Sequence, residues 1–281
     1  MLLWLSFPIC IFGGIVAVKN EVGAGQRFWD EIKSDSVISP MGAGILGVEG
    51  VAEVEIDTVM WGDSFAGSIL MSLDEQLRRH GRSSIAVAND GCTPVIGLRR
   101  IYDGFGCSAN LNRYIFDQIL LSSSVENIVL IGNFSKFLGD NLNRSYRLGE
   151  EIVEPSDVFE VLKYMAKAIN ERGKKLILVG DPSSFSKKVP DYLIEQLGND
   201  ISLDDPILQV SKDKLVSAYG FVKYDLSNML GAIYLDSLEL FCQEKICNAV
   251  MDSGLPIVVD EADLCKEAAD LQALAILRKV N

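Results

Sequence analysis

Residues 59–68, VMWGDSFAGS, pass from an apolar run through Gly-Asp-Ser to small residues. The apolar run predicts a buried strand, and the residues from Ser68 onward have the amphipathic pattern of a helix. Ser64 therefore stands where a strand gives way to a helix. Two roles are open to it: a nucleophile presented at the end of a strand, or a helix cap, since Asp and Ser are preferred at helix N-termini.

The alternation of strand and helix continues along the chain. Apolar runs predict strands over 54–61, 83–89, 127–134, 174–185 and 255–260. Amphipathic patterns predict helices over 68–80, 111–123, 156–173 and 266–280. Near-continuous apolar strands separated by helices are typical of a parallel sheet that is covered by helices on both faces.

Polar residues follow the predicted strands. Asp63 and Ser64 follow the first strand, Gly91 follows the second, Asn133 lies at the end of the third, and residues 260–263 come after the fifth. In open parallel sheets the ligand binds outside the carboxyl ends of the strands. We therefore expect these four loops to converge on one crevice.

The N-terminal residues 1–18 carry no charge, and Lys19 ends the apolar run. At about 1.5 Å per residue, a helix of this length comes close to spanning the hydrocarbon core of a bilayer. A secretory signal peptide and a buried helix are the alternatives, but no basic residue precedes Lys19, as a signal peptide would require. We expect a transmembrane helix or anchor over 1–19 and a linker or irregular extension over 20–54.

The overall charge limits the partners. The 26 Lys and Arg residues face 39 Asp and Glu residues, which gives a formal net charge of −13. Nucleic acids and anionic membrane surfaces both require a basic footprint, so neither is expected as the main partner.

Four cysteines lie in two short segments of the chain. Cys92 and Cys107 bound a Gly-rich stretch, and Cys242 and Cys247 bound QEKI. Two such loops suit disulfides in an oxidising compartment. A metal site is the alternative, but the spacing does not resemble that of zinc ligands and no histidine is near. We expect no metal and no cofactor, with Cys265 left over as a small buried residue.

Three motifs and the C-terminal region together resemble a known family. GDS, NDGCTP and IGNFSKF resemble the blocks of an SGNH-type hydrolase domain. The stretch LDSLELFCQEKICNAVMDSGLPIVVDEADLCKEAADL resembles the end of the periplasmic SGNH domain that is fused to membrane O-acyltransferases of the acyltransferase-3 family. That resemblance implies a three-layer flavodoxin-like domain over 55–281, with a mainly parallel five-stranded sheet.

The resemblance also assigns roles to residues. Ser64 matches the nucleophile, and its N–H, the Gly91 N–H and the Asn133 side chain match the oxyanion hole. Asp260 matches the acid of the family motif D-x-x-H-L-S-x-x-G-A. Asp263 stands where that motif has histidine, and the resemblance implies disulfides Cys92–Cys107 and Cys242–Cys247.

The chain's one histidine, His80, is no substitute. It lies 16 residues after Ser64, roughly 20 Å away along the predicted helix. A serine hydroxyl needs a base of near-neutral pKa, and an exposed Asp has a pKa of about 3.9. Burial of Asp263 beside Asp260 could raise the pKa of one of the two carboxyl groups, because like charges suppress joint ionisation.

The family implies two alternative functions. One is an extracytoplasmic domain of an inner-membrane O-acyltransferase that uses Ser64 to transfer acetyl groups to surface polysaccharide. The other is a catalytically inactive SGNH domain that binds carbohydrate or a membrane acyltransferase partner. In both cases the partners expected are a carbohydrate acceptor and a membrane acyltransferase module, in cis or on a separate chain, with the globular domain in the periplasm.

Overall fold

The computed structural model describes residues 44–50, 55–89, 92–100, 109–134, 138, 146–148, 151–152, 155–180, 189, 192–193, 208–258 and 263–281. The predicted membrane segment, residues 1–19, lies outside these ranges. Within them, no helix has the length and apolar character needed to cross a membrane.

The central sheet consists of five parallel strands and one antiparallel edge strand, in the order β1-β3-β2-β5-β8-β10. The strands are β1 (Gly44–Gly50), β2 (Thr58–Gly62), β3 (Ser83–Asn89), β5 (Asn127–Ile131), β8 (Lys175–Val179) and β10 (Ala232–Leu235). From β2 the chain moves to β3 on one side and then to β5, β8 and β10 on the other, which is the strand order of flavodoxin-like folds. The predicted α/β fold with a mainly parallel five-stranded sheet is confirmed.

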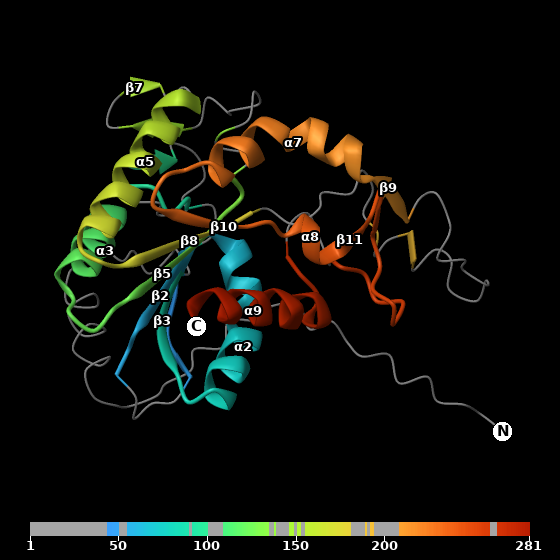
Figure 1. Ribbon diagram of the computed structural model, residues 1–281, viewed down its shortest axis with the longest axis horizontal. Helices are drawn as coiled ribbons and strands as arrows, with labels where there is room; N and C mark the ends of the chain where they lie inside the picture. Colours follow the sequence, from blue (N-terminus) through green and yellow to red (C-terminus); the bar gives the residue numbers. More distant parts are fainter. Residues whose placement is uncertain are drawn as a thin grey trace.

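Helices cover both faces of this sheet, as Figure 1 shows. One face carries α2 (Ser64–Arg79) and α9 (Lys266–Val280), and the other carries α3 (Ala109–Leu121) and α5 (Pro155–Glu171). Side chains alternate between the two cores because successive strand residues point to opposite faces. In β5, for example, Ile128 and Leu130 join the core under α3 and α5, whereas Val129 and Ile131 join the core under α2 and α9.

Residues 44–50 form a strand, although we predicted a linker or irregular extension over 20–54. The backbone of β1 pairs antiparallel with the whole of β3, from Gly44 opposite Asn89 to Gly50 opposite Ser83. The sequence GILGVEG obscures this strand, since glycine is depleted in strands. Because β1 is antiparallel, Gly44 lies at the edge where the parallel strands end, called the carboxyl edge below.

The predicted fifth strand, 255–260, is not a strand of the central sheet over its described part, 255–258. The fifth parallel strand is β10, which pairs with β8. Residues 255–258 instead make two isolated bridges, Val250 with Pro256 and Val258 with Leu264. In the sequence the apolar run LPIVV (255–259) is one residue longer than AIYL (232–235), but AIYL forms the strand beside β8.

A small disulfide-bonded sheet is built from one strand that precedes β10 in the sequence and two that follow it. It has the order β11-β12-β9, with β9 (Gln209–Ser211), β11 (Cys242–Gln243) and β12 (Ile246–Asn248), and it flanks α7 (Lys212–Ser227) and α8 (Leu238–Phe241). Cys242 and Cys247 are directly opposed and form the expected disulfide. Cys92 is also disulfide-bonded, and its predicted partner Cys107 lies outside the described residues. Cys265 is buried and forms no disulfide.

A third sheet lies beside α3 and α5. It has the order β4-β6-β7 and consists of β4 (Leu98–Arg100), β6 (Tyr146–Leu148) and β7 (Glu151–Ile152). Leu98 and Tyr146 join the core on that face of the central sheet.

Candidate active site

The turn between β2 and α2 depends on the close approach of two strands. A Cβ atom on Gly62 would lie 2.1 Å from the backbone oxygen of Ile131, so only glycine fits this position of β2. Helix α2 then begins at Ser64, four residues before the start that the amphipathic pattern predicted. The chain therefore turns from strand to helix within Asp63, and Ser64 is the first helical residue.

Asp63 holds this turn from both sides. It is 4% exposed, and its Oδ1 accepts a hydrogen bond from the Phe65 N–H at 3.0 Å, which caps α2. Its Oδ2 accepts a hydrogen bond at 2.9 Å from the N–H of Asn133, just past the end of β5. The Asp63 N–H in turn donates to the Ile131 oxygen at 3.3 Å.

These contacts lie at the switch point of the sheet. After β2 the chain moves outward in one direction to β3 and later in the other to β5, so β2 and β5 flank the position at the carboxyl edge where open α/β sheets have their ligand crevice. Ligands of open α/β sheets bind at this point. Ser64 and Asn133 thus lie at the place where the fold itself predicts a ligand site.

Ser64 is half-buried, and its hydroxyl oxygen has no hydrogen-bond partner in the described part of the chain. The helix cap is supplied by Asp63, so Ser64 is not needed for that role. Its hydroxyl lies at the N-terminus of a 16-residue helix, where the unpaired N–H groups and the helix dipole favour negative charge. Such a position can stabilise the charge that develops when a serine attacks a carbonyl carbon.

The turn after β3 packs beside this crevice. Cys92, Thr93, Pro94 and Val95 are all buried. The Pro94 Cδ lies 3.2 Å from the position that a Cβ atom on Gly132 would take, and Asp63 Oδ2 lies 3.6 Å from the same position. The Cys-Thr-Pro turn therefore packs next to the hydrogen bond between Asp63 and Asn133.

Two of the predicted site residues, Gly91 and Asp260, lie outside the described residues. Asn133 is placed beside Asp63 by its backbone. The roles of Gly91 and Asn133 in an oxyanion hole and of Asp260 as the acid remain predictions.

Asp263 lies three residues before α9. Lys266, the first residue of that helix, pairs with Glu75 at 3.5 Å. Glu75 is eleven residues, or about 16 Å along α2, from Ser64. Because 255–260 is not the fifth strand, the assignment of Asp263 to the catalytic crevice rests on the resemblance alone.

His80 lies where the sequence predicted. It is the C-terminal cap of α2, exposed to solvent, and its Nδ1 lies 2.8 Å from the Gln76 backbone oxygen. Ser64 is at the opposite end of the same helix, so His80 cannot act on it within one molecule. No cluster of His, Cys, Asp or Glu side chains among the described residues could hold a metal ion.

The carboxyl edge also includes Asp236 and Ser237, which sequence reasoning missed. They follow β10, the strand that was itself missed; its sequence signal was the short run AIYL after a glycine. The Ser237 hydroxyl donates to the Gly180 oxygen at the end of β8. Asp236 Oδ1 accepts from the Leu238 N–H at 3.0 Å and its other oxygen pairs with Lys223, so both residues serve the structure of this edge.

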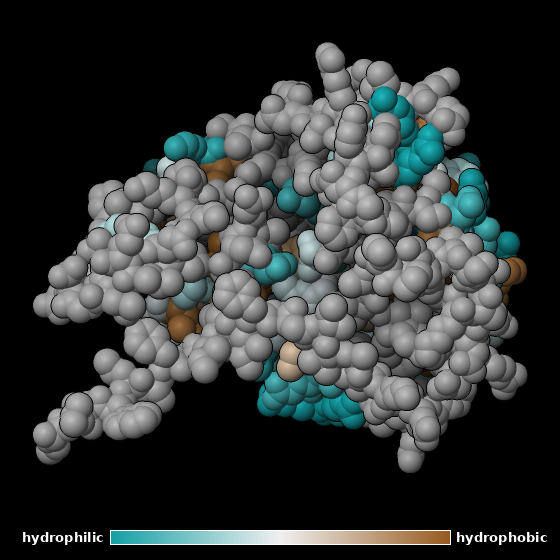
Figure 2. All heavy atoms as spheres, turned by 180° about the vertical axis from the view of Figure 1, so that it is seen from behind, coloured by the Kyte–Doolittle hydropathy of each residue, from teal (hydrophilic) through white to brown (hydrophobic). Residues whose placement is uncertain are grey.

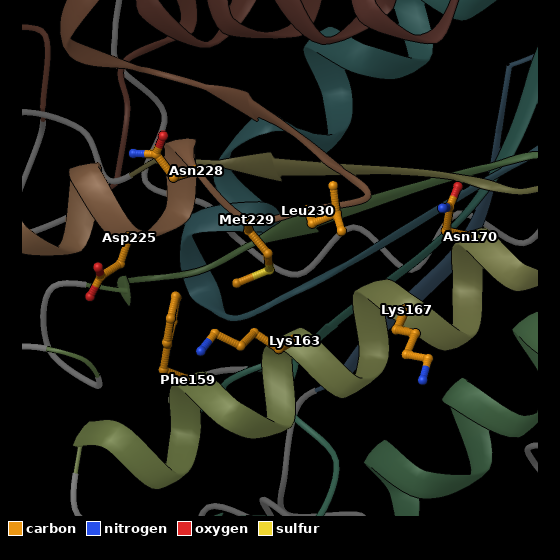
Figure 3. Close-up of a pocket in the computed structure, with 8 residues that line it drawn as sticks. All are labelled: Phe159, Lys163, Lys167, Asn170, Asp225, Asn228, Met229 and Leu230. Carbon is orange, nitrogen blue, oxygen red and sulfur yellow. The ribbon is translucent and has the colours of Figure 1, made fainter.

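A hollow of about 460 Å³ lies away from the Ser64 turn, between α5 and the turn after α7 (Figure 3). Phe159, Lys163 and Met229 converge there, whereas the polar ends of Lys167 and Asn228 point away from the hollow (Figure 3). The Lys163 ammonium lies 4.5 Å from the centre of the Phe159 ring and also pairs with Glu160. The hollow thus lacks a convergent set of polar groups. Figure 2 shows the hydrophobic residues on the described surface only as small separate areas.

The fold and the serine turn together define an SGNH-type α/β domain. The chain belongs to the family of SGNH domains fused to AT3 domains, whose sequence model matches residues 41–263. This match confirms the resemblance stated from the sequence, and it includes residues 41–50, which we had assigned to an extension. Among curated proteins, none matches the sequence.

Several solved structures are similar to this chain. The periplasmic domain of a lipopolysaccharide acetyltransferase from Salmonella ser. Paratyphi A is 16% identical, with a TM-score of 0.56 over 80% of this chain and 84% of that one. A putative acylhydrolase from Bacteroides fragilis is 12% identical, with a TM-score of 0.47 over 93% and 98%. A GDSL-like lipase from Bacteroides thetaiotaomicron is 9% identical, with a TM-score of 0.47 over 92% and 97%.

Proposed function

We propose that this chain supplies the extracytoplasmic SGNH domain of an O-acyltransferase that acetylates a surface polysaccharide through Ser64. The proposal is carried by the position of Ser64 at the N-terminus of α2, at the switch point of the sheet. Its hydroxyl makes no hydrogen bond within the described residues. The family match adds the AT3 context. The similar Salmonella domain comes from a lipopolysaccharide acetyltransferase, which supports a polysaccharide acceptor.

The reaction would proceed in two acyl transfers. In the first, Ser64 Oγ bonds to the carbonyl carbon of an acetyl donor, the hydroxyl proton passes to a base, and the donor's leaving group departs with a proton. In the second, a sugar hydroxyl attacks the acetyl-serine ester, which restores the Ser64 hydroxyl and yields an O-acetylated sugar. Asp263, which stands at the histidine position of the family motif, would be the base, and the N–H groups of Ser64 and Gly91 with the Asn133 side chain would bind the oxyanion.

The path of the chain is compatible with a donor at the membrane. Gly44 pairs with Asn89, and Ala88 pairs with Gly62, so the chain enters the sheet at the edge where the Ser64 turn lies. Two strand spacings, about 10 Å, separate β1 from β2 at this level. An anchor over residues 1–19, or an AT3 module, would thus connect to the side of the domain that carries Ser64.

A catalytically inactive SGNH domain that binds carbohydrate or the AT3 partner is the alternative. The observation in its favour is that aspartate replaces the motif histidine at position 263, while His80 lies at the far end of α2.

A serine-reactive fluorophosphonate separates the two functions. We expect the full-length chain to be labelled at Ser64, and Ser64→Ala to remove the label. Ser68→Ala, which changes the next serine of α2, is the matched control and should keep it. Absence of labelling in the wild-type chain would refute acyl transfer through Ser64 and leave the binding function.

A further inference from the structure

Asn112 is the buried polar residue that fixes the turn after β3. It lies in the first turns of α3, is 1% exposed, and directs its amide nitrogen at two backbone oxygens of the neighbouring loop. Asn112 Nδ2 donates to the Thr93 oxygen at 2.9 Å and to the Val95 oxygen at 3.0 Å. Both donor hydrogens of the amide are thus used on one turn.

Backbone hydrogen bonds also shape this turn. The Val95 N–H donates to the Thr93 oxygen at 2.8 Å, which makes a tight turn centred on Pro94. The Thr93 hydroxyl is fully buried and has no hydrogen-bond partner within the described residues, so it does not secure the turn. The Val95 oxygen also accepts a hydrogen bond from the Leu98 N–H at 3.2 Å, so the Asn112 amide supplies a second hydrogen bond to each of the two carbonyl groups and joins the turn to α3.

The Cys92–Val95 turn is connected to Ser64 through a series of contacts. Pro94 packs against Gly132, and the adjacent Asn133 N–H donates to Asp63 Oδ2. The other oxygen of Asp63 caps the helix that begins with Ser64. Four consecutive contacts therefore connect α3 on one face of the sheet to the Ser64 turn at the carboxyl edge.

We propose that Asn112 is a positioning residue of the candidate active site: its amide sets the Cys92–Val95 turn against Gly132 and so maintains the Asp63–Asn133 hydrogen bond that orients Ser64. The effect on Ser64 reactivity rests on the proposed function, whereas the effect on the Asp63–Asn133 bond does not. A displacement of about 1 Å at a reacting group can reduce a rate by 10²-fold, so a residue of this kind matters without touching substrate.

Amide hydrogen exchange of the full-length chain tests the proposal directly. In Asn112→Ala, we expect the Asn133 N–H to exchange at least tenfold faster, with the amides of Ile128 and Val129 in the centre of β5 changing much less. The matched control is Ile119→Ala, which opens a cavity two turns further along the same buried side of α3. That control should accelerate exchange at Asn133 and in β5 together, because it lowers global stability alone.

A second variant keeps the test decisive if Asn112→Ala does not fold. Pro94→Ala retains the Asn112 hydrogen bonds but removes the ring that contacts Gly132, so it should raise exchange at Asn133 selectively. If neither variant changes Asn133 more than Ile119→Ala does, the proposal is overturned.

Fluorophosphonate labelling supplies the functional readout. We expect Asn112→Ala and Pro94→Ala to slow the labelling of Ser64 at least tenfold, and Ile119→Ala to leave the rate in the folded protein unchanged. Failure of the wild-type chain to label would refute the proposed function, and hydrogen exchange would still decide the role of Asn112. Normal labelling of a variant with fast Asn133 exchange would contradict the orienting role.

Discussion

The Asp63 carboxylate joins the start of α2 to the end of β5 by accepting one hydrogen bond from Phe65 and one from Asn133. The two donors are 68 residues apart in the sequence. One buried side chain thus fixes both the helix that presents Ser64 and the loop that faces it, and this explains why the residue before the serine is an acid.

Replacing Asp63 should destabilise the domain and the site together. Asp63→Ala removes a helix cap and leaves a buried N–H at Asn133 without a partner, so we expect a loss of about 2 kcal/mol in the free energy of unfolding. Denaturant unfolding measures this loss. The control is Asp74→Ala on the same helix, where an exposed pair with Arg78 is lost and a change within about 0.5 kcal/mol is expected. Equal losses in the two variants would contradict the bridging role.

Gly62 and Gly132 should respond very differently to a methyl group. In Gly62→Ala the new Cβ would meet a backbone oxygen at 2.1 Å, whereas in Gly132→Ala it would meet the ring of Pro94 at 3.2 Å. Backbone atoms in a central sheet cannot move aside, so we expect Gly62→Ala to cost more than about 4 kcal/mol, or to prevent folding. Gly132→Ala should cost about 1 kcal/mol. A comparable loss in both, measured by thermal unfolding, would show that β2 and β5 are less closely packed.

The sequence was sufficient where local patterns and the fold agree. The predicted helix 266–280 and strand 83–89 have the observed bounds, because amphipathic and apolar periodicity alone define them. The turn at Ser64 was also predicted, because Gly-Asp-Ser lies directly between an apolar run that forms a strand and an amphipathic run that forms a helix.

The sequence alone did not predict the elements whose place depends on pairing between distant segments of the chain. Whether AIYL (232–235) or LPIVVD (255–260) completes the sheet depends on which segment can pair with β8, and hydrophobicity favoured the wrong one. The link from Asn112 to Asp63 was equally invisible, because it involves backbone atoms of two loops and three elements distant in sequence.

Helix α9 contains a buried polar side chain that makes no hydrogen bond within the described residues. Gln272 is fully buried, and both its amide atoms lack hydrogen-bond partners within the described residues. A buried unpaired amide costs about 1–3 kcal/mol, so Gln272→Met, which has similar size, should raise the free energy of unfolding by about 1 kcal/mol. Gln272→Ala is the control, and it should gain less because it leaves a cavity. Destabilisation by Gln272→Met would mean that the amide has an ordered water or another partner.

The ion-pair network between α7 and α8 predicts a pH effect. Lys212 donates a hydrogen bond to Glu239 at 2.9 Å, and this bond, with the charges of Lys212 and Lys223, holds the Glu239 pKa below its usual value of 4.5 in spite of partial burial. Because the folded pKa lies below the unfolded one, the stabilisation is present above pH 4.5 and is lost as the pH falls through the folded value.

Lys212→Gln should therefore bring the Glu239 pKa back toward 4.5, as carbon-detected NMR titration of the side chain would show. Lys245→Gln, at the exposed tip of the β11–β12 hairpin, is the control and should leave the pKa where it is. The same titration curve in wild type and Lys212→Gln would rule out this pair as the cause of the shift. We expect only a small effect on stability, because Glu239 is 60% exposed.

The decisive prediction for the proposed chemistry concerns position 263. Asp263→His restores the imidazole that the family motif has there, and a positioned general base typically contributes 10²–10⁴-fold to a rate. We expect the variant to hydrolyse an activated acetyl ester at least tenfold faster than wild type, with a rate that rises as the pH passes about 6.5, the ordinary pKa of histidine.

Asp263→Asn tests whether loss of the carboxylate alone has an effect, and Ser64→Ala combined with Asp263→His must abolish the gain. A gain that survives without Ser64 would come from imidazole acting alone. Absence of any gain would place Asp263 outside the reach of Ser64, in keeping with the start of α9 beside Glu75 rather than beside the N-terminus of α2.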